Sequence, residues 1–324
     1  MRPLNQTILY SFLNHFFRLA LFASFLLTST SCGSEEPEPI PEPFDPPVVE
    51  EPLDPPTSEN PLRILAIGNS FTNNATYYMP QLLSQLYPDN EIFFARVVKG
   101  GGSLNNCWNS LSTGARTYEY YTVQGDSWEK YEPNVNIAEA LEREEWDIVI
   151  LQQVSGFSGV AESYQPYLSK IVSEIHSHCP DASIGWQMTW SYSRNSTHTD
   201  FARYHNDSQE MYDSIVSALD EVRPYVDFII PSGTLIQQLR QTEFNTSRDL
   251  TEDGIHLASG LPRYALTCLW HEVLIASRTG KSCLGNSLRP KDAVPVKDES
   301  ANKIFNLITT LLENETASLN EIHI

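Results

Sequence analysis

The sequence is poor in cysteine, with five among 324 residues, and their spacing matches no zinc-binding module. Four of the five lie beyond the N-terminal region and allow three disulfide pairings: Cys107, Cys179, Cys268 and Cys283. The first pairing to test is Cys268–Cys283, because a helix and a return loop can bring these residues together. Unpaired buried thiols are the alternative.

Basic residues are also scarce, with 21 Lys and Arg against 41 Asp and Glu, and the net charge is −20. Residues 1–32 carry +2, residues 33–61 carry −9 and the remaining 263 residues carry −13. A domain this acidic has no basic surface to follow phosphates, which argues against a nucleic-acid partner. Beyond the N-terminal region, no apolar run is long enough to span a bilayer.

The N-terminal 32 residues have the features of a signal peptide. Their only charges are two arginines, and a short apolar run over Leu19–Leu27 is followed by small residues and Cys32. LTSTSC resembles a bacterial lipobox, which implies that Cys32 is lipidated and that the protein is exported and anchored to the outer membrane. Ser34-Glu35-Glu36 resembles a surface-export tag. The alternative is an ordinary signal peptide that is cleaved nearby.

Residues 33–61 are expected to form an extended tether. This stretch holds ten prolines and nine acidic residues and has no Lys or Arg. Such a composition buries too little apolar surface to fold. The predicted organisation is therefore a signal peptide at 1–32, a tether at 33–61 and one globular domain at 62–324.

In the globular part, apolar strand patterns alternate with amphipathic helix patterns. Strands are predicted at Arg63–Ile67, Ile92–Val98, Asp147–Gln152, Ala182–Met188 and Val226–Ile230. Helices are predicted at Met79–Leu86, Val135–Glu145, Tyr164–His178, Asp200–Val222, Thr234–Gln241, Leu261–Ser277 and Glu299–Leu312. This alternation predicts an α/β fold, a three-layer α/β/α sandwich around a mainly parallel five-stranded sheet. The aromatic segment Tyr118–Tyr131 is expected to form an inserted hairpin.

Two motifs carry residues suited to nucleophilic catalysis. In RILAIGNSFTNN the first strand ends on Gly-Asn-Ser, which places the Ser70 hydroxyl at the carboxyl edge of the sheet, where open α/β sheets bind ligands. In DGIHLASG, Asp253 lies three residues before His256. A carboxylate beside an imidazole fixes the tautomer of the histidine, so Ser70, His256 and Asp253 form a candidate triad. A polar turn and a surface pair are the simpler readings of the two motifs.

These motifs resemble the first and last blocks of the SGNH, or GDSL-type, hydrolases, with Asn69 in place of the usual Asp. The resemblance covers residues 62 to about 280, and it is strongest to the exported Bacteroidetes branch that is catalogued as a domain of unknown function (DUF4886-like). It implies an SGNH, flavodoxin-like fold and a serine nucleophile. It also implies an ester substrate and no metal or organic cofactor.

The two middle blocks of the family depart from its pattern. KGGGSL offers Gly100, Gly101 and Gly102 as backbone oxyanion donors, and a plain flexible loop is the alternative. The usual Gly-x-Asn-Asp block is replaced by LQQVSG, where Gln152 or Gln153 could supply the amide N–H and Ser155 lies about where the Asn would fall. Gln153 is the preferred donor. The predicted oxyanion hole therefore comprises Ser70, Gly101, Gly102 and Gln153.

Three further residues are candidate substrate contacts: Asn69, Gln152 and Trp190. Trp190 would join Trp108, Trp186 and Tyr192 in an aromatic platform for a sugar ring, although Trp186 lies in a predicted strand and is equally suited to the core. His198 and His205 are expected to be solvated on a helix rather than to bind a metal.

The sequence thus predicts a serine esterase that removes an O-acetyl or similar acyl group from a carbohydrate. Its partners would be a small-molecule or polysaccharide ester and, through the lipid anchor alone, a membrane. Two alternatives stay open. The chain could be a glycan-binding surface lipoprotein whose oxyanion hole has decayed, or an acyltransferase that uses the same triad.

Overall fold

The computed structural model describes residues 55–322, and side chains up to residue 314. The predicted signal peptide, Cys32 and most of the predicted tether lie outside the described residues.

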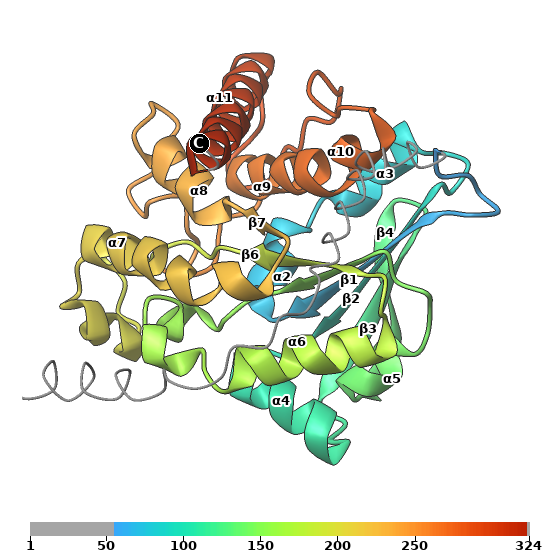
Figure 1. Ribbon diagram of the computed structural model, residues 1–324. Coiled ribbons are helices and arrows are strands. Elements are labelled where there is room, and N and C mark those ends of the chain that lie inside the picture. The colour runs from blue at the N-terminus through green and yellow to red at the C-terminus, as the bar shows by residue number, and fades with distance from the viewer. Residues whose placement is uncertain (1–54, 323–324) are drawn as a thin grey trace, which may run out of the picture. The chain divides into compact units, whose positions relative to one another are not determined.

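A seven-stranded sheet with the order β4-β3-β2-β1-β5-β6-β7 forms the centre of the fold (Figure 1). Its strands are β1 (Leu62–Gly68), β2 (Ile92–Val98), β3 (Tyr118–Gln124), β4 (Ser127–Val135), β5 (Ile148–Leu151), β6 (Ser183–Gln187) and β7 (Phe228–Ile230). Strands β1, β2, β5, β6 and β7 run parallel to one another. They are the five strands that the alternating pattern predicts, so the α/β class is confirmed.

The two additional strands are the antiparallel hairpin β3–β4, which extends the sheet beyond β2. The hairpin in the aromatic segment is confirmed, but the strand count of five is too low. Its side chains alternate between buried and partly buried along β3, as is typical of a strand with one face more fully covered than the other.

Helices cover both faces of the sheet, which gives the three predicted layers (Figure 1). One face carries α4 (Leu104–Thr113), α5 (Ile137–Leu141) and α6 (Tyr167–His178), which pack against one another. The other face carries α2 (Ser70–Ala75), α3 (Met79–Leu86), α8 (Ser232–Arg240), α9 (Leu261–His271) and α11 (Asp298–Ile322). Two further helices are described, α7 (Ser208–Ala218) and α10 (Ser277–Thr279). The remaining elements are the π-helical turn η7 (Glu272–Ala276) and the 3₁₀ turns η2 (Ser155–Phe157), η3 (Ala161–Ser163), η4 (Thr199–Tyr204), η5 (Leu219–Glu221) and η6 (Arg223–Tyr225). None of the helices between residues 55 and 322 is long and apolar enough to cross a membrane.

One predicted helix is broken in the structure and two others were not predicted, each for a local reason. The helix expected over Asp200–Val222 is broken, because His205 and Asn206 adopt positive φ angles of 51° and 58°. Asp207 then caps a new helix, α7, by accepting hydrogen bonds from two backbone N–H groups. Helices α2 and α4 follow the Gly-Asn-Ser and triple-glycine turns and are not apparent from apolar periodicity.

Candidate active site

Ser70 lies directly after β1, the strand at which the chain reverses its direction of winding. Strand β1 pairs with β2 on one side and with β5 on the other, so its carboxyl end is the topological switch point where open α/β sheets bind ligands. Asn69 caps α2 by accepting the Phe71 N–H at 2.9 Å, which makes Ser70 the first residue of that helix. A Cβ atom on Gly68 would lie 2.0 Å from Thr72 Oγ1, so the close approach of β1 and α2 requires glycine there.

The structure brings Ser70, His256 and Asp253 into one hydrogen-bonded chain. Ser70 Oγ lies 2.9 Å from His256 Nε2, and His256 Nδ1 lies 2.6 Å from Asp253 Oδ2. The second carboxylate oxygen of Asp253 accepts the backbone N–H groups of Ile255 and His256. His256 therefore contacts both of the other predicted residues, Ser70 through one ring nitrogen and Asp253 through the other.

These contacts determine which nitrogen of His256 carries the proton. Partial burial alone would raise the pKa of Asp253, but the hydrogen bonds from the His256 ring and from two backbone N–H groups outweigh it and lower that pKa below its usual value. The carboxylate is thus an acceptor at neutral pH, so Nδ1 of neutral His256 is protonated. Nε2 is then free to accept the Ser70 hydroxyl proton.

Hydrogen bonds from two other parts of the fold hold the backbone on either side of His256. Asn74, one turn after Ser70 on α2, accepts the Leu257 N–H at 2.8 Å. Trp190 Nε1 donates to the Ile255 carbonyl at 2.9 Å, and its ring stacks on Phe71 with centroids 3.9 Å apart. Trp190 is therefore fully buried beneath the triad, and its predicted contact with substrate is wrong. Trp186 is likewise buried in the core.

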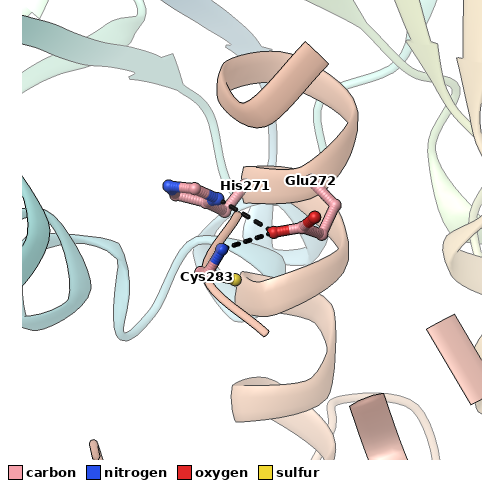
Figure 2. A group of neighbouring side chains, drawn as sticks. All are labelled: His271, Glu272 and Cys283. Atoms are coloured by element: carbon pink, nitrogen blue, oxygen red, sulfur yellow. Dashed lines mark hydrogen bonds and ion pairs between the residues drawn. The ribbon is translucent and has the colours of Figure 1, made fainter. Parts of the chain in front are cut away.

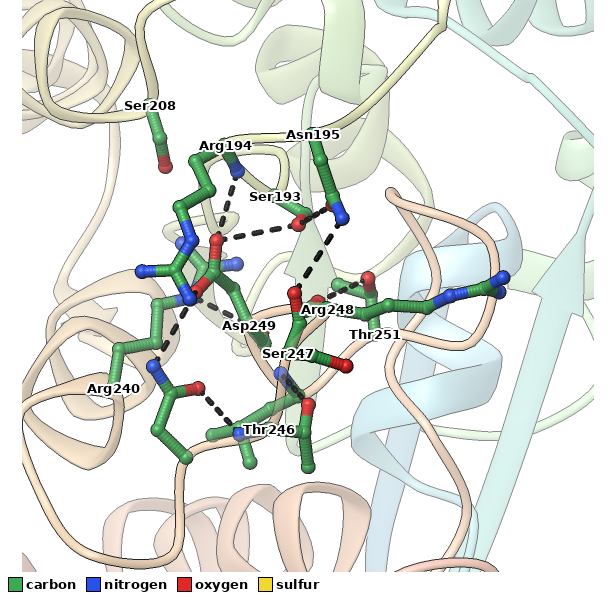
Figure 3. Close-up of polar contacts among 12 residues, drawn as sticks. Ser193, Arg194, Asn195, Ser208, Arg240, Thr246, Ser247, Arg248, Asp249 and Thr251 are labelled. Atoms are coloured by element: carbon green, nitrogen blue, oxygen red, sulfur yellow. Dashed lines mark hydrogen bonds and ion pairs between the residues drawn. The ribbon is translucent and has the colours of Figure 1, made fainter.

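A second set of contacts secures the loop that carries Asp253 and His256 (Figure 3). Asp249 is buried and adopts a positive φ of 50°. Its carboxylate accepts the Arg194 N–H at 2.8 Å, the Ser193 hydroxyl at 3.2 Å and the Asn245 amide at 3.3 Å. Arg240 donates to the Asp249 carbonyl oxygen. This polar network joins the loop to the segment that follows β6 and thereby limits the positions of His256.

A pocket of about 540 Å³ opens beside Ser70, within the size range of small-molecule sites. Its lining residues come from five segments of the chain: Asn69 and Ser70; Gly100, Gly101, Ser103 and Asn106; Val154, Ser155 and Phe157; Tyr192, His198 and Asp200; and Ile255 and His256. Ser155 lies 3.0 Å from the Tyr192 hydroxyl. Burial raises the pKa of Tyr192 to about 12, so its hydroxyl is neutral at physiological pH.

Within the glycine-rich loop, Gly101 and Gly102 have different environments. Gly101 lines the pocket with a φ of +63°, and no acceptor among residues 55–322 pairs with its N–H group. The N–H of Gly102 donates to the Lys99 carbonyl at 2.9 Å, and its own carbonyl accepts the Asn69 amide at 2.9 Å. Gly102 is buried and has no N–H to offer an oxyanion, so its predicted role is wrong.

The two glutamines at the end of β5 face away from the pocket. Gln153 donates its amide to Ser163, and its carbonyl oxygen accepts the N–H groups of Leu104 and Val154. It therefore caps the start of α4 and is not available as an oxyanion donor. Gln152 accepts the Thr72 hydroxyl at 2.7 Å and is buried, so it does not line the pocket as predicted.

The sequence analysis missed one pocket residue, Asn106, and expected another environment for a second, His198. Asn106 accepts the Ser103 N–H and hydroxyl through Oδ1, at 3.1 and 3.0 Å, which leaves its Nδ2 as a donor without a partner in the described part of the chain. The Ser-x-x-Asn capping box after the glycines was the available signal. His198, expected to be solvated on a helix, instead precedes η4 and lines the pocket. Asn69 lines it as well, although both of its side-chain hydrogen bonds are to backbone.

Away from the pocket, His271, Glu272 and Cys283 form the one group in the described chain with metal-ligating atoms within 4.8 Å of one another (Figure 2). Glu272 accepts the Cys283 N–H at 2.6 Å and the Ser282 hydroxyl at 2.9 Å. Through these bonds the Glu272 carboxylate holds the loop that follows α10, which accounts for its position without a metal. The Cys283 thiol donates to the Cys268 carbonyl oxygen, and both cysteines are buried free thiols.

The sequence profile described as "Domain of unknown function (DUF4886)" matches residues 63–304. A crystal structure of a DUF4886 family protein from Bacteroides uniformis is 27% identical with a TM-score of 0.69, and the match covers 78% of this chain and 94% of that one. A protein from Parabacteroides merdae provisionally described as a GDSL-like lipase is 12% identical with a TM-score of 0.46, over 67% and 95% of the two chains. The acetylxylan esterase Axe2 from Geobacillus stearothermophilus is 10% identical with a TM-score of 0.44, over 66% and 94%. No curated protein matches the chain.

Proposed function

This chain belongs to the DUF4886 family, and on that premise we propose that it is a serine esterase that acts through an acyl-enzyme. The observation that carries the proposal is the continuous contact from Ser70 Oγ through His256 to the Asp253 carboxylate. Nucleophile, base and orienting carboxylate in this order are the arrangement that activates a serine hydroxyl.

In the proposed acylation step, His256 Nε2 accepts the Ser70 proton while Oγ attacks the ester carbonyl. Asp253 stabilises the imidazolium that results. His256 then donates the proton to the leaving alcohol oxygen, and Ser70 retains the acyl group. In the second half-reaction, water gives its proton to His256 and attacks the acyl carbon, which releases the acid and restores the serine.

In this proposal, three donors stabilise the negative oxygen of the tetrahedral intermediate. Ser70 and Gly101 offer backbone N–H groups, and the Ser70 N–H also lies at the N-terminus of α2, where the helix dipole favours negative charge. Asn106 offers its Nδ2 group from the first turn of α4. We assign to Asn106 the role that an amide at the end of β5 was expected to have.

The proposed substrate is an acyl group, such as O-acetyl, on a carbohydrate. The pocket supports this choice because hydroxyl, amide, imidazole and carboxylate groups share its wall with Phe157 and Ile255. We also propose that the protein is exported and anchored through Cys32. Radioactive palmitate should label the wild type but not Cys32→Ala, and equal labelling of both proteins would contradict the anchor.

The test of the esterase compares residues 55–324 with the Ser70→Ala variant on p-nitrophenyl acetate and on acetylated polysaccharides. We expect acid release by the wild type alone, together with labelling of Ser70 by a fluorophosphonate. Equal release by both proteins would rule out the serine mechanism. Binding of the polysaccharide without release or labelling would favour the glycan-binding alternative, and transfer to a sugar hydroxyl in place of water would favour the acyltransferase.

A further inference from the structure

One wall of the pocket is formed by the segment between β6 and α7, and this segment runs beside the histidine of the triad. Ser193 donates its N–H to the Gly254 carbonyl at 2.9 Å. A Cβ atom on Gly254, whose φ is +96°, would lie 3.1 Å from the Ser196 Cα. His198 follows two residues later, so it lines the pocket on the side of His256, whereas the glycine-rich loop lines it with Gly100 and Gly101.

The position of His256 indicates which part of an ester this wall contacts. His256 returns its proton to the leaving alcohol, so the alcohol must lie on the side of the pocket next to that imidazole. The oxyanion donors Gly101 and Asn106 lie on the glycine-rich loop and the helix that follows it. Residues near His198 therefore face the alcohol portion of the substrate.

His198 presents a hydrogen-bond donor to the pocket. Its Nδ1 accepts the Asp200 N–H at 3.3 Å, which caps η4 and assigns the proton of the neutral ring to Nε2. The ring packs against Tyr192, with centroids 5.2 Å apart, and 37% of the side chain is exposed. Because Nδ1 is engaged in the cap, Nε2 is the atom left to bind a ligand.

Asp200 presents an acceptor next to this donor. Its Oδ1 accepts Arg203 Nε at 3.3 Å, and its Oδ2 rests on Gly156, where a Cβ atom would come within 2.2 Å of it. The carboxylate is thus held at the end of the β5 loop by a glycine that leaves room for it. No lysine or arginine is among the described residues that line the pocket, so the lining offers no such cation to balance the negative charge of an anionic ligand.

We propose that His198 and Asp200 form a binding subsite for the hydroxyl groups of a neutral sugar ring, the alcohol portion of the ester. This inference rests on the proposed esterase function. A sugar hydroxyl is both a donor and an acceptor, so two neighbouring hydroxyls match the His198 Nε2–H donor and the Asp200 carboxylate. The subsite selects the leaving alcohol and leaves the chemistry at Ser70 unchanged.

The test uses His198→Asn and Asp200→Asn. At position 198, asparagine is a good N-cap, so it can still accept the N–H of residue 200, but it is too short to reach the sugar. At position 200, asparagine keeps the shape of the side chain but removes the negative charge of the acceptor. His205→Ala is the matched control, because His205 is 81% exposed, pairs with Glu210 and does not line the pocket. Thermal unfolding of each variant checks that the fold is retained.

We expect each of the two subsite variants to lower kcat/KM for O-acetylated xylan, mannan and glucan oligosaccharides by about 10-fold or more, as is usual for a lost hydrogen bond in a site. The ratio of kcat/KM for the oligosaccharides to that for p-nitrophenyl acetate should therefore fall, because the leaving group of p-nitrophenyl acetate has no hydroxyls and the acyl-enzyme is the same. An equal decrease on both substrates, or no decrease on either, would overturn the subsite.

If the wild type hydrolyses no ester and a fluorophosphonate does not label Ser70, the proposed esterase fails but the subsite can still be tested. Calorimetric titration of Ser70→Ala with the same oligosaccharides, with and without His198→Asn, then measures binding directly. Weaker binding by the double variant supports the subsite. Equal binding, or no binding by either protein, overturns it.

Discussion

If Asn106 is a donor in the oxyanion hole and Gln153 is not, substitutions at these two positions should affect catalysis differently. Aspartate at position 106 keeps the Oδ1 atom that accepts the Ser103 N–H and hydroxyl, so the N-terminal cap of α4 is preserved. It replaces only Nδ2, the atom without a partner in the described residues. The Asn106→Asp substitution therefore removes one donor while leaving the local fold intact.

The expected loss follows from the role of that donor. Removing one oxyanion donor costs about 100- to 1,000-fold in kcat, or about 2.7–4 kcal/mol of transition-state stabilisation. The added carboxylate repels the developing negative charge, so Asn106→Asp should lie at or beyond the upper end of this range. Asn106→Ala should fall within it and should also lose about 0.5–2 kcal/mol of unfolding free energy with the cap.

Gln153 provides the control, because its amide is bound to Ser163 and to the start of α4. Gln153→Met leaves the N–H groups of Leu104 and Val154 without an acceptor, at a cost of about 1–3 kcal/mol each in unfolding free energy. Its kcat should stay within about 10-fold of the wild type, since no donor to the oxyanion is lost. The assays are p-nitrophenyl acetate turnover below the unfolding transition and urea unfolding. Wild-type turnover by Asn106→Asp, or a 100-fold loss by folded Gln153→Met, would refute the assignment.

Four further predictions concern the triad and its supports. Asp253→Asn should lower kcat by about 10,000-fold in the same assay, since the amide favours the wrong tautomer of His256; a variant with near-normal turnover would exclude the proposed base. The pKa of Asp253 is lower when folded than its usual value of 3.8, so its contribution to stability is complete above that pH and disappears as the pH falls through the lowered pKa. The difference in urea midpoint between the wild type and Asp253→Asn should therefore be constant near neutral pH and shrink below about pH 4, and a difference that grows in acid would contradict this sign. Asp249→Ala should cost about 3 kcal/mol in urea unfolding, because it leaves the Ser193 hydroxyl and the Arg194 N–H without their carboxylate acceptor and removes the negative charge near the buried Arg240; an unchanged midpoint would show that the network is dispensable. Gly68→Ala should cost about 1–3 kcal/mol through the clash with Thr72, and Thr72→Ala in the same chain should recover part of it; no loss would mean that β1 and α2 can separate freely.

The placement of Ser70, Asp253 and His256 could be predicted because each is specified locally. A buried strand that ends on Gly-Asn-Ser fixes the serine at the sheet edge, and the three-residue spacing of Asp253 and His256 lets one loop form their contact. Chain order on an α/β fold then brings the two segments to the same edge. None of these steps depends on the orientation of a distant side chain.

The roles of Gln153 and Trp190 could not be predicted, because each depends on which neighbour the side chain meets. A polar residue at a strand end suits a pocket and a helix cap equally well, and Gln153 caps α4 only because that helix begins beside β5. Trp190 is buried because its ring stacks in parallel on the ring of Phe71. Asn106 was missed for the opposite reason, since α4 is too polar in its first turn for apolar periodicity to reveal it.

The contact between Ser70 and His256 joins residues 186 positions apart in the chain. The two segments meet only after the sheet, α2 and the loop that carries His256 have come together, and contacts of such long sequence separation form late in folding. A fluorophosphonate reacts with an activated serine, so the rate at which labelling of Ser70 returns after dilution from denaturant would time this last step. The proposed nucleophile would thus serve as a built-in reporter of complete folding, independent of any knowledge of the natural ester.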